Sequence, residues 1–299
     1  MKEEREAEAA RAAPARPPGT IPLADPDLRG PRLEIDYLGV ELALRRHQID
    51  ETIVVFGSAR IPEPEVAAQR LAVLEKLAAE HPDRDLSVPL AAAGKQVAQG
   101  RYYDEARAFG RLVGRAGRES GHGRLAVMTG GGGGIMEAAN RGAHDVGAPS
   151  VGLNILLPQE QQTNRFISKG LGFEMRYFAI RKLHLLLRAK ALVAFPGGFG
   201  TLDELFETLN LIQTGRIDAM PVVLVGSAFW NRVFDIDFLI DEGMISRGDR
   251  SLLRYAETAQ EAWDRIVEWY AATGLPFLGD GGVPIRPASE AMPKPATGR

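Results

Sequence analysis

Two glycine-rich stretches carry the residues best suited to chemistry in this chain. One is Gly130–Gly134, an unbroken glycine run, and the other is Pro196–Gly200, with the sequence PGGFG. Each follows a short apolar segment typical of a buried strand and precedes a helical pattern. A strand, a glycine turn and a helix N-terminus in succession present free N–H groups and a positive dipole end to an anion. Together the two stretches predict a ligand with a phosphate and a second polar portion.

Simpler interpretations of the same stretches stay open. A glycine run is also flexible linker chemistry, and PGGFG is also a tight turn. We favour the anion cradle because the run lies between the apolar segment Arg124–Thr129 and a helix that starts at Ile135.

Arg181 and Glu204 are the charged side chains that we expect beside these loops. Thr201 and Glu204 have capping-box spacing, so a purely structural role for Glu204 is open, and Arg181 has surface exposure as its alternative. Asp203 points about 100° away from Glu204, so the two are not a carboxylate pair on one face. A carboxylate and a guanidinium beside a phosphate cradle suit cleavage of an N-glycosidic bond, because a carboxylate stabilises an oxocarbenium-like transition state.

The elements that position these residues alternate between strands and helices. This order predicts an α/β fold, a Rossmann-like doubly wound parallel sheet with helices on both faces, in a single domain. We expect strands at Glu51–Gly57, Arg124–Thr129, Pro149–Leu157, Phe173–Tyr177, Ala191–Phe195, Pro221–Gly226 and Arg254–Glu257. Right-handed crossovers bring the loops that follow the strands to one edge of the sheet. That edge is where the glycine loops, Arg181 and Glu204 should meet.

The helical pattern predicts the helices that cover the sheet and the boundaries of the domain. We expect helices at Leu33–Asp50, Val66–Glu80, Leu90–Arg118, Ile135–Val146, Phe178–Lys190, Phe229–Glu242 and Ala259–Tyr270, and one that starts at Thr201. Residues 1–31 are predicted to form a disordered arm, 32–276 the nucleotide-binding domain and 277–299 a flexible tail. Residues 61–100 are predicted to be a helical insertion between the first strand and its crossover helix.

The amino-acid composition excludes several kinds of chemistry and of binding partner. The chain has 299 residues, a net charge of −3 and no cysteine. The absence of cysteine excludes disulfides, thiolate catalysis and cysteine-ligated metals, and indicates a reducing cytoplasm. The near-neutral charge favours neither nucleic acid nor an anionic membrane as a partner, and no stretch has the length of a membrane span. The sequence also lacks GxSxG, HExxH and a Walker lysine.

The motifs resemble those of the Lonely Guy (LOG) family of cytokinin-activating phosphoribohydrolases, whose members are often labelled lysine decarboxylases. The resemblance rests on GGGGGIMEAAN (Gly130–Asn140), Arg181-Lys182 and PGGFGTLDE (Pro196–Glu204), and extends from Thr52 to Tyr270. It implies a Rossmann-like homodimer or higher homo-oligomer that hydrolyses nucleoside 5′-monophosphates to free base and ribose 5-phosphate. AMP or N6-modified adenine nucleotides are the implied substrates, and no metal or organic cofactor is implied.

The resemblance also assigns roles to residues. Arg181 and Glu204 would be the catalytic pair. The residues that would bind the substrate are Gly131, Gly132, Gly134, Met136, Lys182, Gly197, Gly198, Gly200, Thr201 and Ser58. Taken alone, Ser58 and Arg60 fit a simple polar turn equally well.

The chain departs from the compact plant members of that family. The insertion at 61–100, the N-terminal extension of 50 residues and the long loop Asn154–Asn164 resemble a larger bacterial branch, for which AMP or another purine nucleotide is the safer expectation. The leucine-rich segments Leu183–Leu187 and Leu209–Ile212 fit either a dimer surface or the core beneath it.

Other functions fit the same fold. One is a non-catalytic carrier or sensor for a nucleotide or the molybdenum cofactor, and another is a regulator whose insertion and tails recruit a partner. Arg181 and Glu204 argue against a pure carrier, because phosphate binding needs no carboxylate beside it. We reject lysine decarboxylation, since it needs a Schiff-base lysine and Lys182 lies beside an arginine at a phosphate cradle.

Overall fold

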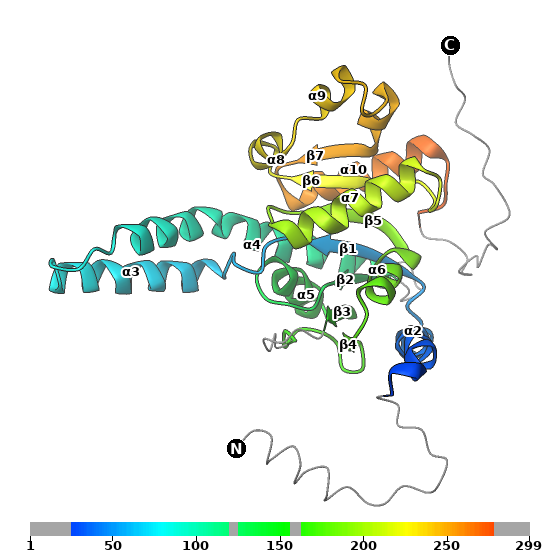
Figure 1. Cartoon of the computed structure of the whole chain (residues 1–299), viewed down its shortest axis with the longest axis horizontal. Helices are drawn as coiled ribbons and strands as arrows, with labels where there is room; N and C mark the ends of the chain where they lie inside the picture. Colours follow the sequence, from blue (N-terminus) through cyan, green and yellow to red (C-terminus); the bar gives the residue numbers. More distant parts are fainter. Residues whose placement is uncertain (1–24, 120–124, 156–162, 278–299) are drawn as a thin grey trace, which may run out of the picture.

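The chain folds around one seven-stranded parallel sheet (Figure 1). This computed structural model describes residues 25–119, 125–155 and 163–277, so most of both predicted tails and part of the loop before Asn164 lie outside the described residues. The strands are β1 (Glu51–Phe56), β2 (Leu125–Thr129), β3 (Ser150–Ile155), β4 (Gly172–Met175), β5 (Ala189–Ala194), β6 (Val222–Val225) and β7 (Leu253–Ala256). Every neighbouring pair is parallel. The predicted α/β class and doubly wound parallel sheet are confirmed.

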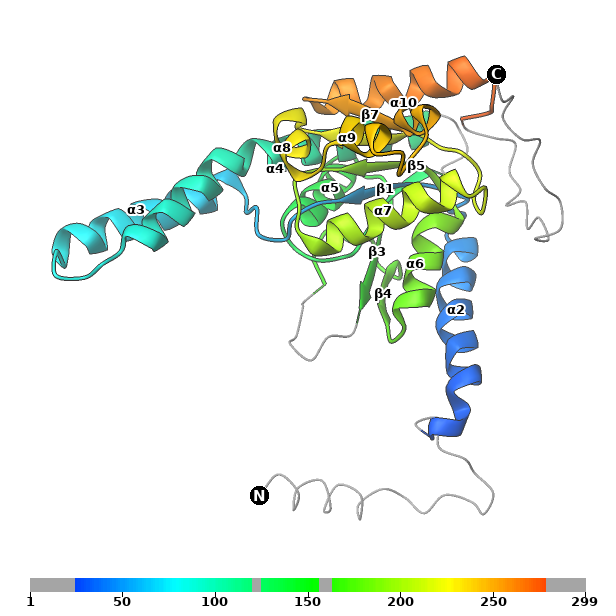
Figure 2. The same cartoon turned by 45° about the horizontal axis from the view of Figure 1, so that its top comes forward.

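Helices cover both faces of the sheet (Figures 1 and 2). They are α2 (Arg29–Arg46), α3 (Pro64–Glu80), α4 (Ser87–Glu119), α5 (Ile135–Asp145), α6 (Phe178–Leu187), α7 (Phe199–Gln213), α8 (Ser227–Val233), α9 (Ile236–Asp241) and α10 (Ala259–Thr273), with short 3-10 turns η1 (Pro26–Leu28) and η2 (Arg247–Leu252). Within these residues, no helix combines the length and apolar character that a membrane span requires.

The alternation of side chains along β1 shows why the sheet needs two covering layers. Ile53 and Val55 are fully buried against α4, α5 and α10, whereas Val54 and Phe56 are buried against the layer of α2, α6, α7 and α8. A strand buried on both faces is continuously apolar, as the IVVF segment of β1 is. The two cores fix β1 at the centre of the molecule.

The strand order reverses beside β1. The order is β4-β3-β2-β1-β5-β6-β7, so the chain builds outward from β1 to β4 and then returns to place β5 on the other side of β1. Two hydrogen bonds join the loops at the carboxyl ends of these strands: Ser58 N donates to Pro196 O (3.0 Å), and Ile135 N donates to Ser58 O (3.2 Å). The reversal therefore creates the crevice in which α/β proteins bind ligands.

Three predicted helices were wrong in extent. The helix expected over Leu33–Asp50 lies at Arg29–Arg46, four residues earlier at both ends. The helix expected over Phe178–Lys190 ends at Leu187, because Arg188 already pairs with the sheet by accepting from Thr52 N (2.8 Å). The helix expected over Phe229–Glu242 is interrupted at Phe234, whose backbone is extended, and Asp235 then caps α9. Trp230 is buried as predicted, and Phe234 is half-buried.

The predicted insertion is a helical arm that projects from the body of the domain (Figures 1 and 2). Helix α3 packs along the first half of α4, which is a single helix of 33 residues rather than a separate insertion followed by a crossover helix. Close contact between Gly100 and Pro64 holds the base of the arm, where an added Cβ would lie 3.3 Å from the proline ring. The arm is thus an extension of the crossover helix itself.

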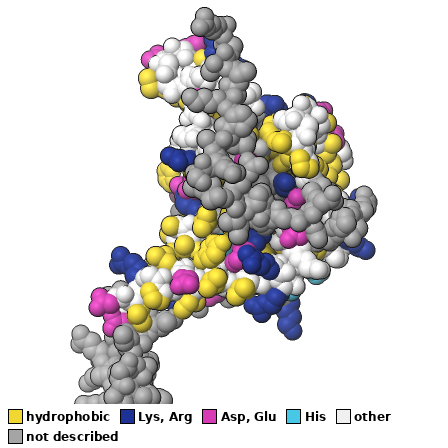
Figure 3. Space-filling model, turned by 90° about the vertical axis from the view of Figure 1, so that its right-hand side faces the viewer, with side chains coloured by type: hydrophobic (Ala, Val, Ile, Leu, Met, Phe, Trp, Pro, Cys, Tyr) yellow, Lys and Arg dark blue, Asp and Glu magenta, His cyan; other side chains and the backbone are white. Residues whose placement is uncertain are grey.

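A buried ion pair attaches α2 to the domain. Arg188 Nη1 lies 2.8 Å from Glu41 Oε2, and the two side chains are only 2% and 6% exposed. Hydrogen bonding from Arg188 holds the pKa of Glu41 below its ordinary value of 4.5. Next to the pair, the buried His184 stacks on Tyr37 and hydrogen-bonds to Tyr37 O at 3.1 Å. Figure 3 shows the molecule from the side on which α2 lies in Figure 1.

We predict that Glu41→Gln lowers the free energy of unfolding by about 3–5 kcal/mol at pH 7, because it leaves Arg188 buried without its counter-charge. The lowered pKa of Glu41 means that its contribution is present above pH 4.5 and is lost as the pH falls through the folded-state pKa. Urea unfolding at several pH values measures both effects. Glu34→Gln, on the exposed face of the same helix, is the control. An equal loss in the two variants at pH 7 would contradict the role of the pair.

Candidate active site

Arg181 and Glu204 meet at the carboxyl edge of the sheet. Arg181 Nη1 lies 3.0 Å from Glu204 Oε1, and their side chains are 14% and 5% exposed. Arg181 also donates from Nε to Leu153 O at 2.9 Å, which fixes the plane of the guanidinium. An added Cβ at Gly130 would lie 2.8 Å from Arg181 Nη2, so the guanidinium lies directly over the first glycine of the run. One arginine therefore joins the glycine loop after β2 to helix α7.

The capping box expected for Thr201 and Glu204 is absent. Helix α7 begins at Phe199 with Gly198 at the N-cap, and Gly198 O accepts hydrogen bonds from Thr201 N and Leu202 N. Glu204 therefore lies in the second turn, too far from the helix start to cap it, and its carboxylate is turned inward to Arg181. The carboxylate is free of a capping role.

Burial is the main influence on the ionisation of this pair. It raises the pKa of Glu204 above 4.5, with the positive charges of Arg181 and Lys182 acting in the opposite direction. Burial likewise lowers the pKa of Arg181, while Glu204 opposes that change. An arginine nevertheless keeps its proton at any physiological pH. The site thus holds a permanent cation against a carboxylate whose ionisation is costly.

Glycine is needed at two positions of the run because of the backbone conformation there and because other atoms lie close to the backbone. Gly131 has φ +76° and Gly134 has φ +64°, a region that side chains disfavour. An added Cβ at Gly131 would lie 2.2 Å from Asn154 Oδ1, and one at Gly134 would lie 2.4 Å from Ser58 O. The loop is therefore a tightly packed turn rather than a flexible linker.

A polar network that the sequence did not predict supports this loop. Asn164 Nδ2 donates to Gly131 O (3.2 Å), Gly132 O (3.0 Å) and Asn140 Oδ1 (3.0 Å). Thr129 Oγ1 donates to Asn140 Oδ1 at 2.8 Å and accepts from Gly131 N at 3.0 Å. All of these groups are buried, so their hydrogen bonds are made in a low dielectric, where loss of one is costly.

One member of this network, Asn140, could have been identified from the sequence. Asn140 is a polar residue on the buried face of α5, among apolar and small residues such as Ala139 and Ala143. Asn164 could not have been identified in this way, because its partners lie 24 to 33 positions away in the chain.

The second glycine loop leads into α7 and is open to solvent. Gly198 and Gly200 are exposed, and an added Cβ at either position would meet no atom within 4 Å. An added Cβ at Gly197 would lie 2.1 Å from Thr201 Oγ1, which packs the buried threonine side chain against the turn. The first N–H groups of a helix have no partner within it, so this open turn offers donors to an anion.

Ser58 and Met136 lie between the two loops. The backbone of Ser58 makes the two bonds that join the loops, and its Oγ accepts from Arg60 N at 3.1 Å. Met136 is half-buried, and added Cβ atoms at Gly130 and Gly132 would lie 3.0 and 2.8 Å from its Sδ and Cε atoms. Apart from Lys182, the predicted site residues therefore lie together at the carboxyl edge of the sheet.

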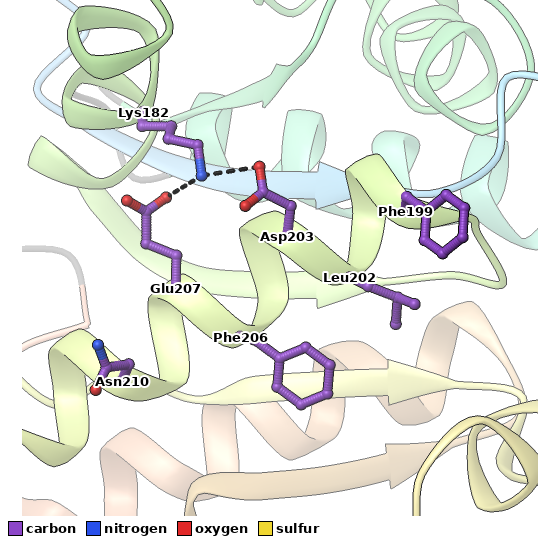
Figure 4. Close-up of a pocket in the computed structure, with 7 residues that line it drawn as sticks. All are labelled: Lys182, Phe199, Leu202, Asp203, Phe206, Glu207 and Asn210. Atoms are coloured by element: carbon purple, nitrogen blue, oxygen red, sulfur yellow. Dashed lines mark hydrogen bonds and ion pairs between the residues drawn. The ribbon is translucent and has the colours of Figure 1, made fainter.

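Lys182 contacts carboxylates on the outer side of α7 (Figure 4). Its Nζ lies 2.9 Å from Asp203 Oδ2 and 2.8 Å from Glu207 Oε2. These residues line a shallow groove together with the apolar Phe199 and Phe206. The geometry pairs Lys182 with Asp203 and Arg181 with Glu204, on different faces of the same helix. Substrate binding by Lys182 stays a prediction.

Comparisons with known proteins agree with the motif resemblance. A family model described as "possible lysine decarboxylase" matches residues 136–266. A probable cytokinin riboside 5′-monophosphate phosphoribohydrolase, LOGL3 of Oryza sativa subsp. japonica, is 32% identical over 148 residues, which are 48% of this chain and 68% of that protein. The cytokinin riboside 5′-monophosphate phosphoribohydrolase LOG4 of Arabidopsis thaliana is 30% identical over 147 residues, which are 48% of this chain and 66% of that protein.

A comparison with solved structures also found a match. It is the Moco carrier protein from Chlamydomonas reinhardtii, at a TM-score of 0.43 and 18% identity, covering 75% of this chain and 99% of that chain.

We predict that Asn164→Asp disrupts the glycine loop. The substitution keeps the shape of the side chain but sets an acceptor against two carbonyl oxygens and Asn140 Oδ1, which should lower the free energy of unfolding by about 2–4 kcal/mol. Chemical unfolding measures the loss, and faster amide exchange at residues 130–134 would locate it. Asn210→Asp makes the same change at an exposed position of α7 and should be nearly neutral. Similar losses in both variants would contradict a supporting role for Asn164.

Proposed function

The chain belongs to the LOG family, and from that premise we propose that it hydrolyses the N-glycosidic bond of a nucleoside 5′-monophosphate. The products would be the free base and ribose 5-phosphate. The observation that carries this proposal is the buried Arg181–Glu204 pair, with side chains 14% and 5% exposed, between two glycine loops. Chemistry at a carboxylate, rather than phosphate binding alone, explains why a carboxylate is buried at this place.

The phosphate is proposed to bind the turn at Gly197–Thr201. Support comes from the open backbone at Gly198 and Gly200 and from the N-terminal end of α7, a helix of 15 residues. The ribose and base would then extend toward Gly130–Gly134, near Met136 and Ser58. This orientation brings the ribose close to the carboxylate of Glu204.

In the proposed reaction, the bond between ribose C1′ and the base nitrogen breaks and its electron pair stays on the base. Positive charge develops on C1′ and the ring oxygen, and the ionised Glu204 stabilises it electrostatically. A water molecule oriented by the carboxylate adds its oxygen to C1′, and the proton that it releases balances the negative charge of the departing base. Arg181 holds Glu204 in place and offers a cation to the phosphate or ribose oxygens.

The substrate is proposed to be AMP or an N6-modified adenine nucleotide. The relatives LOGL3 and LOG4 support this class, since they are named as cytokinin riboside 5′-monophosphate phosphoribohydrolases, LOGL3 as a probable one. The aligned region covers about half of this chain, at 48%. For this reason AMP, GMP, CMP, IMP and N6-isopentenyl AMP belong in the same assay.

A homodimer is proposed for the active form. Leu183 and Leu187 on α6 are 45% and 37% exposed, and Phe206 on α7 is 42% exposed, which gives this layer an apolar outer face for a second copy. The other predicted surface, Leu209–Ile212, contributes to the core instead, since Ile212 is only 8% exposed and Leu209 packs against the same cluster.

We predict that Glu204→Gln lowers kcat for base release by about 10²–10³-fold, since it removes the stabilising charge. Chromatography of the free base and ribose 5-phosphate measures the rate. Asp203→Asn removes the neighbouring carboxylate, which pairs with Lys182 on another face, and should change kcat only a few-fold. Tight nucleotide binding without base release by the wild type would instead favour the carrier or sensor alternative.

We also predict an acid limb in the pH profile of kcat with a midpoint above 4.5. The reaction needs ionised Glu204, and burial raises the pKa of this group, so activity is lost as the pH falls through the raised value. The pH dependence of the residual rate of Glu204→Gln shows how much of the profile comes from titration of the substrate. Asp203→Asn should retain the acid limb of the wild type. A rate that increases as the pH falls would assign the protonated acid as the active form and contradict this account.

A further inference from the structure

Helix α2 has a second apolar face that the domain does not use. Ile35, Leu38 and Leu42 are 47%, 39% and 47% exposed and follow the i, i+3, i+7 spacing of one helical stripe. The opposite face carries Val40 and Leu44, which are 2% and 0% exposed in the core. We call Ile35, Leu38 and Leu42 the α2 stripe. Hydrophobic side chains gather on this side of the molecule in the space-filling view (Figure 3).

The position of α2 keeps this stripe away from the rest of the described domain. The helix attaches through its buried face and through Arg188–Glu41. Its N-terminal half is held by Asp36 Oδ2, which accepts from Arg176 N at 3.0 Å, and its N-terminal end extends beyond the body of the molecule (Figure 2). An added Cβ at Gly39, beside the stripe, would meet no atom within 4 Å. A neighbouring helix could therefore approach closely at this point.

The first twenty residues of the chain are poorly suited to cover the α2 stripe. Residues 1–20 contain no valine, isoleucine, leucine, phenylalanine, tryptophan or tyrosine. A segment of this composition has little apolar surface to bury against Leu38 and its neighbours. The occupant has to bring apolar side chains of its own.

A second copy of α2 supplies both the apolar and the charged partners. When two α2 helices run antiparallel about a two-fold axis, Ile35 of one copy faces Leu42 of the other, and Leu38 faces Gly39. On one flank, Glu34 of each copy comes opposite Arg45 of the other. Arg45 is 59% exposed at its side chain and holds Glu41 at 2.6 Å, so its remaining donors face solvent. The antiparallel arrangement also sets the helix dipoles in opposite directions.

We propose that the α2 stripe is a self-association surface, which pairs with the same stripe of a second chain in an antiparallel two-fold contact. Isologous contacts of this kind are the commonest way in which identical chains pair. Because the stripe consists of three apolar side chains, we expect the pairing to depend on protein concentration. This surface is separate from the α6–α7 face and from the catalytic edge.

Introduced cysteines test the pairing directly, because the chain has no cysteine of its own. We expect Leu38→Cys to form a disulfide-linked dimer under mild oxidation. Ile35→Cys mixed with Leu42→Cys should cross-link, whereas each of these two variants alone should cross-link far less. Val73→Cys, at a 66% exposed valine on α3, is the control for random collision. Cross-linking of Leu38→Cys no faster than that of Val73→Cys would overturn the proposal, and efficient cross-linking of Ile35→Cys alone would overturn the antiparallel arrangement.

Sedimentation of the full chain over a range of concentrations provides a second measurement. The mass of the wild type should increase with concentration toward twice that of Leu38→Glu, while base release per chain stays equal in the two proteins. Because activity is assayed separately, failure of the pairing is distinguishable from failure of the proposed hydrolysis. If Leu38→Glu has the same mass as the wild type at every concentration but a lower thermal stability, the stripe makes a contact within one chain. That result would overturn the proposal.

Discussion

The reversal of strand order beside β1 is the constraint on which the rest of the site depends. Parallel strands open all their following loops at one edge, but only where the order reverses do two such loops separate and leave a crevice. Here β5 lies next to β1, and Ser58 binds the loops after β1, β2 and β5 through its backbone. The anion-binding turn of α7 and the glycine run before α5 are thereby held on opposite sides of one crevice. Arg181 spans the two sides, and Glu204 lies against it.

Burial of this ion pair has a cost that the fold must offset. Two charges in a low-dielectric crevice stabilise a protein less than apolar side chains of the same volume would. The raised pKa of Glu204 reflects this cost. Neighbouring groups hold the ion pair in place. Leu153 O accepts a hydrogen bond from Arg181, and the network around Asn164 fixes the glycine loop beside it. A costly charge that is held rigidly suits electrostatic stabilisation of a transition state, because no reorganisation is needed when the reaction occurs.

Much of the fold was predictable because its signals are local. The apolar strands, the glycine runs and the order of elements specify a parallel sheet, and its carboxyl edge follows from the handedness of crossovers. The start of α7 was not predictable. Thr201 and Glu204 have the spacing of a capping box, yet Gly198, three residues before Thr201, takes the cap position. The hydrogen bonds from Asn164 to the glycine loop were not predictable either, because nothing in the local sequence indicates a contact 33 residues away. Long-range hydrogen bonds of this kind appear only when the chain is folded.

The most direct test of the central claim separates binding from chemistry in one variant. Calorimetric titration of Glu204→Gln with AMP, followed by product analysis of the same sample, tells whether the carboxylate acts in the reaction or only in the structure. We predict that Glu204→Gln binds AMP within a few-fold of the wild type and releases adenine about 10²–10³-fold more slowly, while the wild type releases adenine and ribose 5-phosphate in equal amounts. Adenine release by Glu204→Gln at the rate of the wild type would contradict the account.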